Sequence, residues 1–252
     1  MYTVCAVRSL PSCANKRNSR ADVTLQGVAI ERSCTARRAG RTQAVAPDTV
    51  PALPIVLASG SPRRRALLAR TGLPFLVAAP TIDESPQAGE SGEALARRLA
   101  RAKALVGAAR YPGAIVVAAD TVVLLDGQLL GKSADIAEAR TMLEALRGRP
   151  HTVTTAVCVV RGADATLRLA ALTTRVWMRQ YSDAEIASYI ASGDPFDKAG
   201  AYAIQHPRFR PVARWQGCYT NVVGLPLCLT AALLHSLGVR LPRTRLVAAD
   251  HA

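Results

Sequence analysis

The chain has 252 residues, of which half are hydrophobic and 4% aromatic, and a formal net charge of +14. This size and composition suit a globular α/β protein and argue against a disordered or fibrous chain. No apolar run approaches the roughly 18 residues that a transmembrane helix needs, so we expect a soluble protein. The positive charge favours polyanionic partners, namely nucleic acid, acidic lipid surfaces or phosphorylated metabolites, without choosing among them.

The cysteine pattern bears on compartment and metal binding. Six cysteines are scattered at positions 5, 13, 34, 158, 218 and 228, and none forms a C-x-x-C pair. A zinc knuckle or a thioredoxin-like motif is therefore not expected. A core of this size does not require disulfides, so the cytoplasm is the expected compartment.

The first fifty residues differ from the rest. They carry eight basic against three acidic side chains, and their apolar residues show no sustained period. A contiguous apolar segment of the kind found in secretory signals is missing. The composition resembles an organelle transit peptide, but a disordered basic tail or an upstream translated extension is the favoured interpretation. We expect a disordered extension over residues 1–50, one domain over 51–240 and a tail over 241–252.

From residue 53 onward, strand-like and helix-like segments alternate. Residues 53–58 form an apolar run typical of a strand buried on both faces, and 73–79 predict a second strand. Between them 61–71 predict a short helix, and 93–110 predict a longer amphipathic one. Two apolar strands, 114–119 and 122–125, flank Asp120, and Asp126-Gly127 predicts a hairpin turn.

The second half of the chain continues the alternation. Residues 134–146 predict a helix capped by Ser133 and closed by Gly148, and 152–160 and 167–178 predict a long hairpin. A capping box at Ser182 opens a helix, and 226–237 form the last one. Parallel-type and hairpin-type strands occur together, so the pattern predicts an α/β fold with a mixed sheet.

A turn rich in glycine and serine, S-G-S-P-R-R-R at residues 59–65, follows the first strand directly. A strand that leads through such a turn into a helix offers backbone N–H groups and the positive end of a helix dipole to an anion. Arg63 and Arg64 could close bidentate hydrogen bonds over phosphate oxygens. The alternative is a capped helix with a solvated basic face, and the Walker motif is absent.

Asp120 follows an apolar run, where a carboxylate is costly to bury unless it is paired, bound to a metal or used in catalysis. It is a candidate general base or metal ligand, the alternative being an acid that caps a turn at a strand end. Glu84, at the end of the second strand, could join it in holding Mg²⁺ with phosphate oxygens. Lys132 could lean over the same site or be solvated, and Lys103 carries a weaker indication.

Two later segments complete the candidates. In D-K-A-G-A-Y-A-I-Q, at residues 197–205, small residues allow a close backbone approach, and Gln205 offers a donor and an acceptor to a base edge. As a bare pattern this segment is a loop. The motif N-V-V-G-L-P-L at residues 221–227 indicates core packing followed by the start of a helix.

Taken in order, these motifs resemble the Maf family of nucleotide pyrophosphatases from about Leu53 to Leu237. The resemblance is carried by A-S-G-S-P-R-R, R-L-A-R-A-K, A-D-T-V-V, G-K, H-T-V-T-T, D-K-A-G-A-Y-A-I-Q and N-V-V-G-L-P-L. It implies an elongated mixed sheet flanked by helices, with two lobes around a nucleotide-binding cleft, usually in a homodimer. It also implies attack of water on the α-phosphorus of a nucleoside triphosphate, with Mg²⁺ or Mn²⁺, releasing pyrophosphate.

The resemblance also implies roles for particular residues. Asp120 matches the family's proton acceptor, and with Glu84 it is the expected metal site. The positions expected around the phosphates and metal are Ser59, Arg63, Arg64, Lys103 and Lys132. The positions that distinguish substrate subgroups are Arg63, Thr121 and Gln205, and they are similar to those of the subgroup acting on dTTP and UTP.

Three departures from the family pattern leave alternatives open. Ser133 replaces a usual proline, H-P-R-F-R replaces a glycine-containing loop after Gln205, and the first fifty residues have no counterpart. A preference for 7-methyl-GTP or CTP is therefore an alternative to dTTP and UTP. A basic nucleic-acid-binding protein without catalysis is the rival of another class, although few aromatic residues are present for base stacking.

Overall fold

The structure, a computed structural model, describes residues 53–242. The expectations for residues 1–50 and for the tail beyond residue 242 lie outside this range. Within it, no helix combines the length and hydrophobicity that crossing a membrane requires. The elements in chain order are β1 (Ile55–Leu57), α1 (Pro62–Ala69), β2 (Phe75–Val77), α2 (Gly92–Arg110), β3 (Ile115–Leu125), β4 (Gln128–Leu130), α3 (Ile136–Leu146), β5 (Pro150–Arg161), β6 (Thr166–Met178), α4 (Asp183–Ala191), the 3₁₀ helix η1 (Asp194–Asp197), β7 (Val212–Gln216), α5 (Tyr219–Val223) and α6 (Leu227–Ser236).

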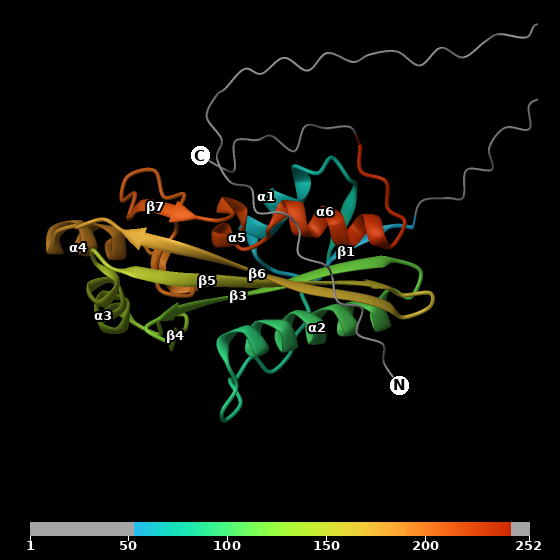
Figure 1. Cartoon of the computed structure of the whole chain (residues 1–252), viewed down its shortest axis with the longest axis horizontal. Helices are drawn as coiled ribbons and strands as arrows, with labels where there is room; N and C mark the ends of the chain where they lie inside the picture. The colour runs from blue at the N-terminus through green and yellow to red at the C-terminus, as the bar shows by residue number, and fades with distance from the viewer. Residues whose placement is uncertain (1–52, 243–252) are drawn as a thin grey trace, which may run out of the picture. The chain divides into compact units, whose positions relative to one another are not determined.

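A seven-stranded mixed sheet forms the centre of the fold (Figure 1). The strand order is β2-β1-β3-β5-β6-β7, with β4 paired to β3 outside this path. β1 runs parallel to β2 and β3, whereas β3, β5, β6 and β7 pair antiparallel. The expected α/β class with a mixed sheet is confirmed, and the sheet does not close into a barrel.

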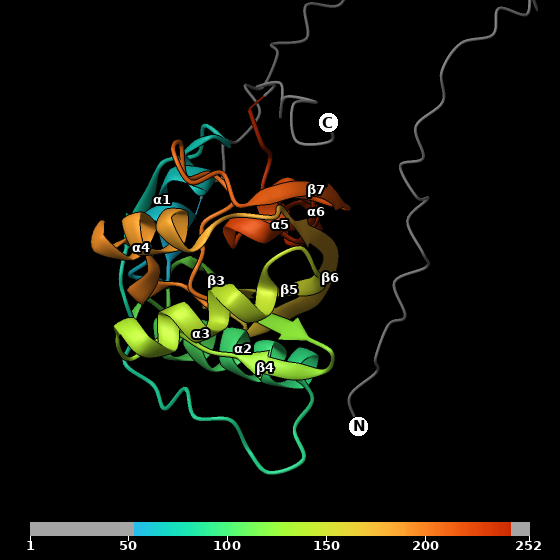
Figure 2. The same cartoon turned by 90° about the vertical axis from the view of Figure 1, so that its left-hand side faces the viewer.

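Helices cover both faces of the sheet where β1 and β2 lie. On one face α2 packs through Leu99 onto Val116 and Ala118, because these strand residues point to the same side. On the other face α1 and α6 pack through Leu68 and Leu234. Figures 1 and 2 show α2 on one side of the sheet and α1, α5 and α6 on the other. The residues of β1 are therefore buried, whereas Leu76 and Val77 of β2, at the edge of the sheet, are exposed.

A third cluster lies where α3 and α4 meet the sheet, at the end that faces the viewer in Figure 2. Leu143 of α3 and Ile186 of α4 pack with Val153 and Val176, which lie on adjacent strands. The capping box predicted at Ser182 is present, with both reciprocal hydrogen bonds to Glu185 formed. The capped start of α4 is thereby fixed beside the sheet.

One sequence expectation about the site strand is wrong. The sequence predicted two strands interrupted at Asp120, but β3 runs without a break from Ile115 to Leu125. The reason is that β5 pairs with β3 at every position from Ile115 to Leu124, so the ladder continues through the carboxylate. Asp120 therefore lies in the middle of a strand and not at its end.

Smaller differences concern helix caps and short elements. Asp135, and not Ser133, caps α3, and its carboxylate accepts a hydrogen bond from the backbone N–H of Glu138 at 2.8 Å. The aspartate lies directly before the first helical residue, whereas Ser133 is buried two residues earlier. The sequence did not indicate η1, β7 or α5, which are short and are held by distant partners.

Candidate active site

A cavity of about 590 Å³ opens at one edge of β3. β1 pairs with residues 115–117 of this strand and β4 pairs with residues 123–125, both on the edge opposite β5. Residues 118–122 therefore have no neighbouring strand on this edge within the described chain. The gap between β1 and β4 leaves room for a ligand of small-molecule size.

The turn after β1 forms one wall of the cavity and begins α1. Ser61 caps this helix, because its hydroxyl oxygen accepts a hydrogen bond from the backbone N–H of Arg64 at 3.4 Å. Pro62 occupies the first helical turn, where its missing N–H costs nothing. The positive end of the α1 dipole consequently faces the cavity, as expected for an anion site.

The guanidinium of Arg64 is fixed at the base of this wall. Its Nε donates to the carbonyl oxygen of Gly224 at 2.9 Å, and Nη2 donates to the hydroxyl of Thr121 at 3.1 Å. Nη1 lies 3.5 Å from Ser59 Oγ. Burial lowers the pKa of Arg64 below its usual value, an effect partly opposed by the charge of Asp120. An arginine remains protonated at neutral pH even so, and Arg64 supplies a fixed positive charge.

Two carboxylates share one ammonium group on the other side of β3. Lys103 Nζ lies 2.6 Å from Asp120 Oδ1 and 2.6 Å from Glu84 Oε1. Lys132 Nζ lies 3.5 Å from the second oxygen of Glu84. Asp120 is 8% exposed and Lys103 7%, so this ion pair is largely removed from water. Burial alone would raise the pKa of Glu84, but the two lysines lower it below its usual value.

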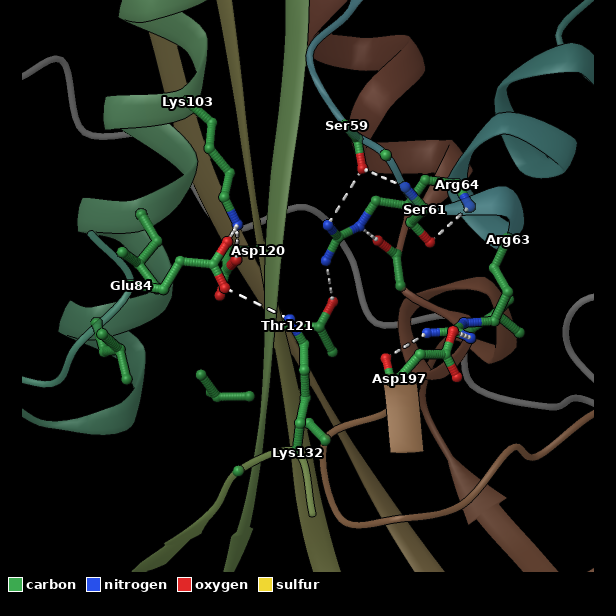
Figure 3. Close-up of a pocket in the computed structure, with 18 of the residues that line it drawn as sticks. Ser59, Ser61, Arg63, Arg64, Glu84, Lys103, Asp120, Thr121, Lys132 and Asp197 are labelled. Carbon is green, nitrogen blue, oxygen red and sulfur yellow. Dashed lines mark hydrogen bonds and ion pairs between the residues drawn. The ribbon is translucent and has the colours of Figure 1, made fainter. Parts of the chain in front are cut away.

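The alternation of β3 places the two halves of the site. Asp120 and Thr121 are consecutive strand residues, so their side chains point to opposite faces of the sheet. Asp120 faces Lys103 on α2, and Thr121 faces Arg64 on α1 (Figure 3). Because the edge of β3 is open here, both faces contribute to the same cavity.

Most of the residues predicted from the sequence meet in this cavity. Those that line it are Ser59, Arg63, Arg64, Glu84, Lys103, Asp120, Thr121 and Lys132. Gln205 does not line it and is exposed to solvent. Its segment reaches the cavity through Asp197 and Ala199 instead. A role of Gln205 in base selection stays a prediction.

Sequence reasoning gave no site role to a buried polar network that supports Arg64. Asn221 is fully buried, and its side-chain amide donates to the Val153 carbonyl oxygen and to Thr174 Oγ1, at 2.9 Å each. Its side-chain oxygen accepts from the backbone N–H of Thr155, whose hydroxyl lies 2.9 Å from Thr121 Oγ1. These contacts fix α5 and thereby the Gly224 carbonyl. The sequence signal that could have indicated this network is an asparagine, Asn221, within an otherwise apolar motif.

The pair of carboxylates is suited to a hard divalent cation. Glu84 and Asp120 already hold a single positive charge between them, that of Lys103, at a distance short enough for direct contact. Within residues 53–242 no group of three or more His, Cys, Asp or Glu side chains gathers to hold a metal. Mg²⁺ binds to one or two carboxylates when phosphate oxygens and water complete its shell, and the two carboxylates fit that requirement.

Fixed cations at a helix N-terminus and a buried carboxylate in one cavity define a class of enzyme that acts on phosphate groups. The chain belongs to the Maf family: residues 54–237 match the Maf-like protein family. This match covers nearly all of the described residues, including all of those that line the cavity.

Several bacterial relatives carry the name dTTP/UTP pyrophosphatase. The protein of that name from Thermomicrobium roseum is 56% identical over 189 residues, covering 73% of this chain and 84% of the relative. The one from Myxococcus xanthus is 52% identical over 188 residues, covering 75% and 94%. A third, from Symbiobacterium thermophilum, is 47% identical over 184 residues, covering 73% and 94%.

Proposed function

We propose that this protein hydrolyses dTTP and UTP to the corresponding monophosphate and pyrophosphate. The relatives described above support this activity by their names and by identities near half over most of their length. The observation that carries the proposal is the shared cavity, which joins the guanidinium groups of α1 with the carboxylate of Asp120. A triphosphate needs both, because its charge must be neutralised and an attacking water must be activated.

In the proposed reaction Asp120 takes a proton from a water molecule as the water oxygen bonds to the α-phosphorus. The bond between that phosphorus and the α–β bridging oxygen breaks, and pyrophosphate leaves with the electron pair. Negative charge grows on the phosphate oxygens during this step, and Arg63, Arg64 and Lys132 stabilise it. Arg64 is held by Gly224 before substrate arrives, so little reorganisation is needed.

A divalent cation is part of the proposal. Glu84 and Asp120 would hold Mg²⁺ or Mn²⁺, which supplies positive charge to the phosphate oxygens when bound. Lys103 contacts both carboxylates and keeps them close together. Ser59 lies beside Arg64, and its side chain would contact the phosphate oxygens directly.

Base preference is proposed from motif positions. Arg63, Thr121 and Gln205 match the positions that distinguish the subgroups, and here they are similar to those of the dTTP and UTP subgroup. A glutamine side chain can match the adjacent carbonyl and N–H of a pyrimidine edge, whereas an unmatched base would leave polar groups unpaired.

A nucleotide panel tests the proposed function. dTTP, UTP, CTP, 7-methyl-GTP and ITP are supplied with Mg²⁺, and the initial rate of pyrophosphate release is measured for each. We expect dTTP and UTP to exceed the other three by about tenfold or more in kcat/KM. A kcat/KM that is highest for CTP or 7-methyl-GTP would contradict the proposed preference for dTTP and UTP. No pyrophosphate from any nucleotide, together with DNA binding that falls steeply with salt, would indicate a nucleic-acid-binding protein instead.

A cytoplasmic homodimer completes the proposal. Within the described residues, Cys158 and Cys218 are free thiols, which fits a reducing compartment. β7 pairs only with the last part of β6, so residues 166–173 of β6 have no strand on their outer edge within the described chain. An open edge of this length supports pairing with a second copy. Light scattering coupled to size-exclusion chromatography would measure the mass directly.

A further inference from the structure

Arg63 and Asp197 meet across the cavity, although 134 positions separate them in the sequence (Figure 3). Nη1 of Arg63 donates to Oδ2 of Asp197 at 2.7 Å, and Nη2 donates to the backbone carbonyl oxygen of Asp197 at 3.3 Å. Both residues line the cavity. The guanidinium of Arg63 is therefore held from two directions by a single residue.

Asp197 is itself fixed in place. Its other carboxylate oxygen, Oδ1, accepts a hydrogen bond from Lys198 Nζ at 2.6 Å. Lys198 is only 7% exposed and also contacts the carboxylate of Asp194 at 3.0 Å. A buried lysine with two carboxylate partners does not swing freely, so Asp197 presents Oδ2 to Arg63 in one orientation.

The segment after Asp197 connects this pair to the opposite wall of the cavity. Ala199 forms an isolated β-bridge with Lys132, and the backbone N–H of Gly200 donates to the carbonyl oxygen of Gly131 at 2.9 Å. A short stretch of chain thus fixes Arg63 on one side and the backbone of Lys132 on the other. The spacing between these two cations depends on it.

We propose that Asp197 is a positioning residue that orients the Arg63 guanidinium for the nucleotide. A guanidinium has five N–H donors, and the contacts to Asp197 use one on each terminal nitrogen. The remaining donors stay available to substrate. A flexible arginine must lose rotamer freedom on binding, and an arginine already held in its bound orientation loses less. Asp197 therefore lowers the cost of binding without touching the reacting atoms.

The exposure of the pair separates this role from a structural one. The side chain of Asp197 is 58% exposed and that of Arg63 24%, and an ion pair so open to solvent contributes little to folding stability. Removing the carboxylate should consequently affect nucleotide binding much more than the melting temperature.

The test is a double-mutant cycle with Asp197→Ala and Arg63→Ala, and it rests on the proposed function for its substrate. We expect Asp197→Ala to raise KM for dTTP about fivefold to tenfold and to leave kcat within twofold. In the Arg63→Ala background the same change should have no further effect, because Asp197 acts through Arg63. Asp183→Ala is the matched control: it breaks the Arg147–Asp183 ion pair, whose side chains are 26% and 73% exposed and do not line the cavity, and KM should be unchanged.

Losses that multiply in the double variant would overturn the proposal, as would an unchanged KM with a lower melting temperature. Calorimetric binding of a non-hydrolysable dTTP analogue to the same four proteins separates the two inferences. A wild-type protein that binds the analogue but hydrolyses no nucleotide would end the proposed function. The coupling between Arg63 and Asp197 would still be measured in the binding constants.

Discussion

Asp120 is held between the β3–β5 ladder and the ammonium group of Lys103. Asp120→Asn keeps the size of the side chain but removes the group that would accept a proton from water. We expect kcat to fall by about 10²- to 10⁴-fold while the circular dichroism spectrum changes little, because Lys103 keeps Glu84 as a partner. Asp126→Asn, in the exposed turn between β3 and β4, is the control and should keep full activity. A wild-type rate in Asp120→Asn would exclude Asp120 as the base.

Lys103 keeps two carboxylates together when no divalent cation is bound. In Lys103→Met those carboxylates lose their cation. We expect the free energy of unfolding to fall by about 2–3 kcal/mol in metal-free buffer. This is less than for a fully buried pair, because Glu84 is half-exposed. Mg²⁺ should then stabilise the variant more than the wild-type protein, because the Lys103 ammonium group no longer competes with it for the two carboxylates. Binding at 100 times Kd contributes about 2.7 kcal/mol.

Differential scanning calorimetry in EDTA and in Mg²⁺ measures both effects of Lys103→Met. Lys132→Met is the matched control, because the Lys132 side chain is 61% exposed and its ion pair with Glu84 is long, at 3.5 Å. Its melting temperature should change little. Equal stabilisation of the wild-type protein and Lys103→Met by Mg²⁺ would show that the ammonium group and the metal do not compete for Glu84 and Asp120.

At the scale of elements, the position of α2 depends on Gly107, one helical turn after Lys103. A Cβ at this position would lie 2.7 Å from Val116 Cγ1 and 3.3 Å from Ala58 Cβ. Gly107→Ala gains about 1 kcal/mol of helix propensity but overpacks the contact by about 1–3 kcal/mol, and a valine methyl group has little room to move. We expect a net loss of stability in urea unfolding. In the double variant with Val116→Ala, the loss of stability should be smaller than the sum of the losses in the two single variants. A Gly107→Ala protein more stable than wild type would refute the close packing.

Local patterns predicted the elements well where neighbours in sequence determine them. The periodicity of α2, the turn at Asp126 and the capping box at Ser182 are such cases. Patterns failed where a distant partner determines the structure. Pairing with β5 keeps β3 continuous through Asp120, which no local pattern indicates. The contact of Asp197 with Arg63 also bridges 134 positions, and no local period reports it. The shared location of the candidate residues followed from the family resemblance and not from spacing alone.

At the scale of the whole described chain, the cavity depends on the mixed character of the sheet. A fully paired strand would have no open edge, but β3 has parallel β1 beside its first residues and antiparallel β4 beside its last. The gap between them exposes both faces of β3 at Asp120 and Thr121. A carboxylate from one face and an arginine site from the other can therefore act on one ligand.

The same reasoning predicts that catalysis does not need the first fifty residues. The family match begins at residue 54, and the described residues that line the cavity lie between Ala58 and Gly224. We expect a protein truncated to residues 51–252 to retain kcat/KM for dTTP within about twofold, because it keeps all the described residues that line the cavity. Steady-state pyrophosphate release from the full-length and truncated proteins, measured at matched ionic strength, checks this. A truncated protein that keeps its circular dichroism spectrum but loses activity would assign the basic extension a part in substrate binding, through its surplus of positive charge.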